Sequence, residues 1–226
     1  MKKITFFIAL FCTSLFSSGV DKAKFIKGEQ IYKETCISCH GLDGKSSTGM
    51  NLVVKPRNLT QTILNQNQIY KVIQKGSHNW GSKSDIMPSF ESIYDKDELS
   101  DIALYVYEKF SKEQQNNFKN LLKSSNNNDK ISLNLGEKIF KRNCKFCHGS
   151  EGKGDGVATT SPVDSIFPYD LTKTLLTRKQ IFLYVKYGGK HFGTDKTDMP
   201  SWKKKYNDFR LRSIARYIDE VIRKKD

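Results

Sequence analysis

Two short stretches decide the fold of this chain: Cys36-Ile37-Ser38-Cys39-His40 and a second copy, Cys144-Lys145-Phe146-Cys147-His148. In each stretch two thiols lie three positions apart and a histidine follows at once. This pattern is typical of covalent haem attachment. Two thiols at the end of a helix can each form a thioether with one vinyl group of a porphyrin, and the histidine then faces the iron. The motifs therefore predict two haem c groups, held by Cys36, Cys39, His40, Cys144, Cys147 and His148.

A zinc site and a redox dithiol are the alternatives. Zinc sites usually combine two cysteine motifs into one tetrahedron, and a dithiol needs no histidine after its second cysteine. The chain has five cysteines, of which Cys12 lies in an N-terminal apolar run. The two motifs use the other four, so no thiol is left for a disulfide or a catalytic nucleophile. The pattern favours haem.

The N-terminus has the layout of a secretory signal peptide. Lys2 and Lys3 precede an apolar run over residues 4–16, and small residues follow at 17–19. We expect residues 1–19 to be removed on export to the periplasm. The apolar run is shorter than the roughly 20 residues that span a bilayer. An uncleaved membrane anchor is therefore the less favoured alternative.

The rest of the chain is a duplication. Residues 28–32 match residues 136–140 at an offset of 108, and after the motifs the offset is 112, because the second copy has four more residues in one loop. The later matches are Pro56 with Pro168, Leu59 with Leu171, Gly76 with Gly188, Met87 with Met199, and Tyr105 with Tyr217. Such ordered similarity indicates a duplicated domain. We expect domains over residues 20–110 and 131–226, joined by a Ser- and Asn-rich linker over 111–130.

The periodicity of each copy predicts helices and no sheet. Apolar residues recur at helical spacing before each motif, in a short segment that ends at glycine, and in a last segment of each copy. The expected helices cover residues 25–35, 68–75 and 97–110, and residues 133–143, 179–187 and 209–223. The helical signal after residue 110 continues through Phe118, Leu121 and Leu122, so the flexible part of the linker could be the Ser/Asn cluster alone. The predicted fold class is all-α.

The second axial position of each iron has two sets of candidate ligands. Met87 and Met199 each belong to a Met-Pro-Ser-aromatic motif before the last helix, where proline would stiffen a loop that presents a thioether. His78 and His191 are the rivals, and each follows a glycine turn. The matched methionine motifs favour Met87 and Met199 as iron ligands over bis-histidine ligation.

The order of these features resembles the class I c-type cytochrome domain. The string from Cys147 to Gly156 is similar to the domain found in periplasmic two-haem cytochromes and in the haem subunit of some respiratory oxidases. The resemblance covers nearly all of the mature chain. It implies proximal His40 and His148 and distal Met87 and Met199.

The same resemblance implies two further features. The first is packing of the N-terminal on the C-terminal helix, through Gly28 and Tyr32 against Tyr105, and through Gly136 and Phe140 against Tyr217. The second is a loop carbonyl, at Pro56 and Pro168, that accepts a hydrogen bond from the proximal histidine. The loop over residues 41–46 departs from the family pattern, because it lacks the Gly-Asp-Gly ending of the second copy.

Charge is distributed unevenly between the copies. Residues 20–110 carry 12 basic and 11 acidic side chains, whereas residues 131–226 carry 20 and 11. The basic excess could simply be solvated. It could also dock an acidic redox partner or an anionic membrane surface. Nucleic acid is not expected as a partner of an exported haem protein.

These features favour a periplasmic two-haem electron carrier, which passes single electrons from a respiratory donor to a terminal oxidase or reductase. Thioether ligation at both irons would leave no open site for a substrate, so no catalytic residue is predicted. The alternatives are a haem enzyme, either peroxidase-like or thiosulfate-oxidising, and a redox subunit of a larger complex.

Overall fold

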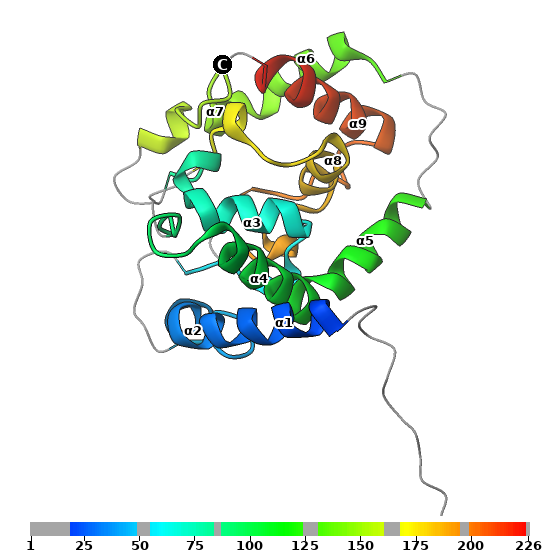
Figure 1. Ribbon diagram of the computed structural model, residues 1–226. Coiled ribbons are helices and arrows are strands. Elements are labelled where there is room, and N and C mark those ends of the chain that lie inside the picture. The colour runs from blue at the N-terminus through cyan, green and yellow to red at the C-terminus, as the bar shows by residue number, and fades with distance from the viewer. Residues whose placement is uncertain are drawn as a thin grey trace, which may run out of the picture.

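The computed structural model describes residues 19–48, 55–83, 87–123, 131–160, 168–194 and 199–224. These residues form helices and turns, with no strand among them. Figure 1 shows one helical domain from the first copy, in blue to green, beneath a second from the later copy, in lime to red. The predicted all-α fold with two tandem domains is confirmed. The predicted signal segment lies outside the described residues except for Gly19.

The first domain is built on three main helices, which match the predicted segments. Two of them continue through π-helical turns, which the sequence did not predict. The elements are α1 (Gly19–Ile31), η1 (Tyr32–Cys36), α2 (Ile37–His40), η2 (Leu59–Gln61), α3 (Gln66–Lys75), η3 (His78–Trp80), α4 (Lys96–Val106) and η4 (Tyr107–Ser111).

The second domain repeats this order, and its first helix has the predicted bounds. The elements are α6 (Leu133–Asn143), α7 (Lys145–His148), η5 (Val157–Thr160), η6 (Leu171–Lys173), α8 (Arg178–Tyr187), η7 (Gly189–Phe192), α9 (Asp208–Tyr217) and η8 (Ile218–Ile222). Short 3₁₀ turns such as η2 and η6 carry too few residues for a periodic signal.

The first helix of each domain crosses the last at a glycine. A Cβ on Gly28 would lie 2.0 Å from Asp101 O, and one on Gly136 would lie 2.0 Å from Ser213 O. Aromatic rings pack beside each crossing, with centroids 5.3 Å apart for Tyr32 and Tyr105. Phe140 and Tyr217 are 5.5 Å apart. The predicted packing of the N-terminal on the C-terminal helix is confirmed in both domains.

A helix occupies the first half of the predicted linker. It is α5 (Lys112–Lys123), which continues α4 and η4 and flanks both domains in Figure 1. Gln115 Nε2 donates to Ile63 O of the first domain, and Phe118 packs in the hydrophobic core of the second. The segment therefore bridges the two domains. The Ser/Asn cluster lies outside the described residues.

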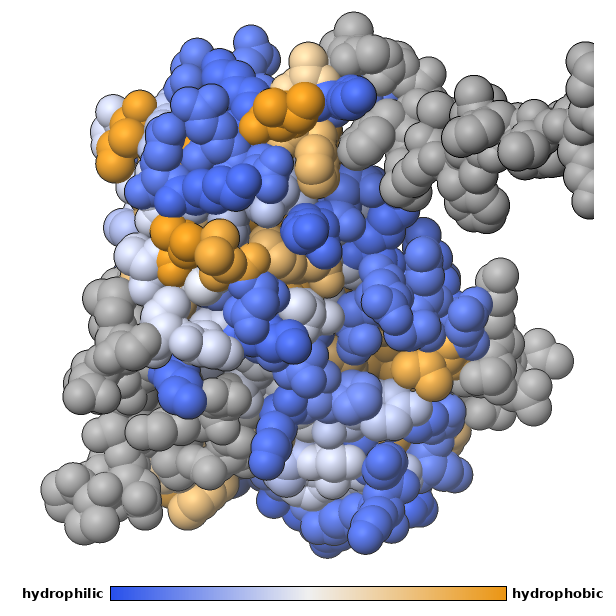
Figure 2. All heavy atoms as spheres, turned by 90° about the horizontal axis from the view of Figure 1, so that it is seen from below, coloured by the Kyte–Doolittle hydropathy of each residue, from blue (hydrophilic) through white to orange (hydrophobic). Residues whose placement is uncertain are grey.

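The face seen in Figure 2 is covered mainly by hydrophilic residues, with hydrophobic residues in separate groups. This view looks from below onto the first domain of Figure 1. Within the described residues, no helix has the length and apolar character that a membrane span requires.

Candidate haem sites

Each Cys-X-X-Cys-His motif lies at the end of the first helix of its domain. Cys36 closes η1 and packs against the core of the first domain, and Cys144 packs against the core of the second. All four motif cysteines are free thiols. Within the described residues no three His, Cys, Asp or Glu side chains gather as a metal cluster would require. The two motifs do not converge, so the geometry gives no support to a shared zinc tetrahedron.

The two motif histidines are held by backbone carbonyls. His40 Nδ1 donates to Arg57 O at 3.3 Å, and His148 Nδ1 donates to Tyr169 O at 3.2 Å. The predicted acceptors, Pro56 and Pro168, were therefore wrong by one residue in each copy. The hydrogen bond fixes the tautomer, so Nε2 of each ring is the nitrogen left for iron.

Burial lowers the pKa of both imidazoles below the ordinary histidine value, and the hydrogen bond to the carbonyl opposes this shift. A lowered pKa keeps the ring neutral, which is the form that binds metal. Both histidines nevertheless retain an intermediate exposed fraction. Each ring is therefore partly shielded from solvent but still accessible.

The loop after each motif follows the same path in both domains. Ser46 N donates to His40 O at 2.9 Å, and Gly154 N donates to His148 O at the same distance. Gly154 has φ 69°, and Ser46 takes φ 58° at the equivalent place. The two loops therefore match as far as Ser46 and Gly154, and Gly156, the last residue of the Gly-Asp-Gly string, adds a bond from its N to Cys147 O at 3.1 Å. Ser46 Oγ also donates to Arg57 O at 3.1 Å, so it shares the acceptor of His40.

The two methionine loops are attached to the preceding helix by matched contacts. Ser77 N donates to Met87 O at 3.0 Å, and Gly189 N donates to Met199 O at 3.1 Å. The next serine bonds a helix carbonyl in both copies, since Ser89 Oγ donates to Gln74 O at 2.7 Å. Its counterpart, Ser201, donates to Lys186 O at 2.8 Å.

Of the Met-Pro-Ser-aromatic motif, the serine bonds through its side chain, and the methionine and the aromatic residue bond through their backbone. The aromatic residue completes the attachment, as Phe90 N donates to Ile73 O at 3.1 Å and Trp202 N to Val185 O at 3.2 Å. Met87 and Met199 each pack against the same core cluster as the first cysteine of their own domain. The structure thus brings each methionine to the core that holds the motif. Its role as iron ligand stays a prediction.

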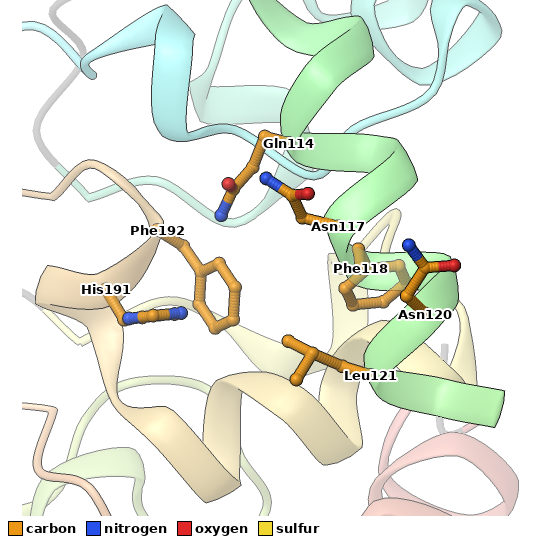
Figure 3. Close-up of a pocket in the computed structure, with 7 residues that line it drawn as sticks. All are labelled: Gln114, Asn117, Phe118, Asn120, Leu121, His191 and Phe192. Atoms are coloured by element: carbon orange, nitrogen blue, oxygen red, sulfur yellow. The ribbon is translucent and has the colours of Figure 1, made fainter. Parts of the chain in front are cut away.

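The rival histidines lie on the short turns η3 and η7. Both His78 and His191 are exposed. His191 stacks on Tyr187, with ring centroids 5.1 Å apart. In Figure 3, His191 and Phe192 of η7 face α5 across a cleft of about 500 Å³. The lining of this cleft includes no motif cysteine, motif histidine or methionine, and its residues are Gln114, Asn117, Phe118, Asn120, Leu121, His191 and Phe192.

The donor set therefore fits haem c in each domain. Two free thiols, an imidazole with its Nδ1 occupied and a methionine loop bonded to the preceding helix occur together twice. A family model described as cytochrome c oxidase, cbb3-type, subunit III matches residues 23–106 and 132–218, once in each domain. The chain belongs to this family. It is a c-type cytochrome with two covalently bound haem c groups.

Two curated relatives of this cbb3-type family member are described as Cbb3-type cytochrome c oxidase subunit CcoP. The one from Cereibacter sphaeroides is 23% identical over 200 residues, covering 84% of this chain and 59% of the relative. The one from Azospirillum brasilense is 23% identical over 206 residues, covering 86% and 61%. The chain thus spans about 60% of the length of these relatives.

A solved structure is also similar to the chain. It is the Kuenenia stuttgartiensis reducing HAO-like protein complex Kustc0457/Kustc0458, at 22% identity and a TM-score of 0.46, covering 85% of this chain and 94% of that one. The haem electron-transfer role of the chain is supported by its membership of the cbb3-type subunit III family.

Sequence reasoning missed the residues that join the two haem domains. Gln68 and Gln180 are buried polar residues in the interface, and Arg57 reaches from the first domain into the second. The repeat offset of 112 pairs Gln68 with Gln180. The available signal was a glutamine at equivalent positions of the duplication, and the sequence does not show that both are buried.

Proposed function

We propose that this chain is a periplasmic two-haem electron-transfer protein, which carries single electrons between a respiratory donor and a terminal oxidase or reductase. The observation that supports it most directly is the duplicated geometry: a histidine held at Nδ1 and a pinned methionine loop in each domain. In this proposal His40 and Met87 are the axial ligands of the first haem, and His148 and Met199 those of the second.

Each bound haem supplies an iron that changes between ferric and ferrous states by one electron. The protein's part is to hold both states with little rearrangement. The carbonyls of Arg57 and Tyr169 orient the imidazoles, and the bonds of the methionine loops keep each thioether in place. With a histidine and a methionine as ligands, each iron would have no free position for a substrate, which would disfavour the peroxidase-like and thiosulfate-oxidising alternatives.

The two CcoP relatives are described as subunits of a cbb3-type oxidase. We propose that this chain likewise works with, or within, a membrane oxidase of that kind. In this proposal residues 1–19 direct export. Affinity purification from membranes under mild detergent distinguishes a subunit from a free carrier: a subunit is recovered in a fixed ratio with oxidase chains, and a free carrier is recovered alone.

The ligand assignment is tested with Met87→His and Met199→His. Thioether favours ferrous iron more than imidazole does, so each variant should keep both haems attached and lower the potential of one haem only. Ferric methionine-ligated haem also absorbs weakly near the red edge of the visible spectrum, and each variant should lose the share of that band from one haem. Unchanged potentials and an unchanged band in both variants would rule out methionine ligation.

A further inference from the structure

The two domains meet through an interface with approximate two-fold symmetry. Asn58 N donates to Gly193 O at 3.0 Å, and Asp170 N donates to Gly81 O at 2.8 Å. The four residues form two pairs at the repeat offset of 112. Each half of the interface is therefore the counterpart of the other.

A buried pair of amides repeats this symmetry. Gln68 and Gln180 exchange two hydrogen bonds of 2.9 Å. Gln68 Nε2 also donates to Leu175 O, and Gln180 Nε2 to Ile63 O, both at 2.6 Å. The hydrogen bonds of the interface are thus matched, whereas the charges of some side chains beside them differ between the two copies.

Arg57 and Tyr169 form one such pair, and the neighbouring Asn58 and Asp170 form another. The carbonyls of Arg57 and Tyr169 accept a hydrogen bond from the motif histidine of their own domain. Their side chains differ, because arginine is a cation and tyrosine carries a phenol. Arg57 Nη1 donates to the Tyr184 hydroxyl and to Phe192 O at 3.3 Å. Both acceptors belong to the second domain. Arg57 thus holds His40 through its carbonyl and reaches the second domain through its guanidinium.

The groups around this guanidinium leave its charge without a counter-ion. Arg57 is partly buried, and among the described residues it contacts the Tyr184 ring and hydroxyl, the Tyr169 side chain and a carbonyl, with no carboxylate. Removing a cation from water is costly unless an anion compensates it. A haem propionate is a carboxylate, and the planar guanidinium fork is well suited to bind one.

We propose that Arg57 binds a haem propionate at the domain interface and thereby makes the two haem groups electrostatically inequivalent. A cation beside a haem favours the ferrous state, because reduction removes positive charge from the iron. The haem whose propionate Arg57 binds is accordingly the one of higher potential. This inference rests on the two haem groups and is independent of methionine ligation and of the electron acceptor.

Equilibrium redox titration of the full chain with both haems attached tests it. Arg57→Gln should lower the potential of one haem and narrow the separation between the two, and Arg57→Lys should keep most of the separation. Arg142→Gln removes an exposed arginine of α6 and should change neither potential. Redox-linked infrared difference spectra give a second readout: the carboxylate bands of one propionate should shift in Arg57→Gln and stay in place in Arg142→Gln.

A purely structural role for Arg57 predicts a different result. If it only joins the domains through Tyr184, then Tyr184→Phe and Arg57→Gln should lower the midpoint of thermal unfolding alike, and the two potentials and the propionate bands should be those of the wild type. That outcome overturns the proposal. So does an equal shift of both potentials in Arg57→Gln. If Arg57→Gln does not fold, the propionate bands of Arg57→Lys decide: replacing the guanidinium fork by an ammonium should shift the carboxylate bands of one propionate, and bands identical to those of the wild type overturn the proposal.

Discussion

At the scale of single residues, two glycines explain how the methionine loops are held. Gly76 and Gly188 end α3 and α8 with φ of 77° and 82°, a region that residues with a Cβ rarely enter. A Cβ on either would also lie 2.8 Å from the carbonyl oxygen of the methionine in the same domain, Met87 or Met199. Each glycine therefore both stops a helix and lets the methionine backbone approach it.

Gly188→Ala should displace the loop of Met199. Strain at this backbone conformation costs about 1–3 kcal/mol, and the contact with Met199 O has no flexible neighbour to relieve it. We expect the second haem to lose its methionine-ligated absorption band while the first keeps it. Lys190→Ala, exposed on η7 nearby, is the control and should leave the spectrum intact. Retention of the full band in Gly188→Ala would contradict the expectation.

A buried carboxylate gives a pH-dependent prediction. Asp101 is one of the buried residues of α4. Burial raises the pKa of its carboxyl, and the positive charges of Lys24 and Lys27 oppose this shift. The folded state therefore binds this proton more tightly than the unfolded chain, and the contribution of Asp101 to stability falls as pH rises above the ordinary aspartate pKa of about 3.9.

Asp101→Asn should raise the midpoint of thermal unfolding near pH 7, since asparagine has no charge to bury. The advantage should shrink as pH is lowered towards about 4, where Asp101 itself is protonated. Glu113→Gln removes an exposed carboxylate of α5 and should have little effect at any pH. A gain for Asp101→Asn that is the same at acid and neutral pH would argue against burial as its cause.

At the scale of elements, each domain depends on the crossing of its first and last helices. The backbones approach so closely at Gly136 that a Cβ would overlap Ser213 O. Gly136→Ala should therefore separate α6 from α9 and destabilise the second domain by about 1–3 kcal/mol or more, as overpacked core positions do. Lys138→Ala, exposed on the same helix, adds a helix-favouring alanine without the overlap. Chemical unfolding of both variants should show the loss only for Gly136→Ala.

The elements that the sequence predicted are those with a long periodic signal. All six main helices were expected, and α6 has the predicted bounds, because apolar spacing and terminal glycines are local features. The proximal carbonyls were placed one residue early, since a loop without periodicity does not show which carbonyl faces an imidazole. The π-helical turns and the interface of Gln68 with Gln180 depend on packing between distant segments, which a single sequence does not display.

At the scale of the whole molecule, part of the excess positive charge of the second domain lies in a run of three lysines. Lys203, Lys204 and Lys205 are exposed and directly follow Trp202. Lys203 Nζ lies 5.3 Å from the centre of the Tyr187 ring. Lys205 Nζ lies 5.2 Å from that of Trp202 and donates to Asn143 Oδ1 at 2.9 Å. Two of the three lysines thus contact aromatic rings while remaining exposed to solvent.

Substitution of these three lysines tests whether they dock an acidic redox partner. Opposite charges steer encounter over about a Debye length, and the three lysines follow the Met199 loop, where the patch and the electron exit would coincide. Replacing Lys203, Lys204 and Lys205 by Gln should slow electron transfer to the isolated partner and flatten its dependence on ionic strength. Stopped-flow measurement across a salt series gives both quantities.

Two controls separate docking from local damage. Lys22 and Lys24 are exposed in the nearly neutral first domain, and their replacement by Gln should change neither the rate nor the salt dependence.

Loss of a cation–π contact costs about 0.5–1 kcal/mol at an exposed site, so the triple variant also needs a thermal unfolding measurement. Lys204→Gln alone leaves both ring contacts in place, and a partial effect of this variant on rate would identify charge as the cause. Equal rates and equal salt slopes for the wild type and the triple variant would leave these lysines with no part in docking.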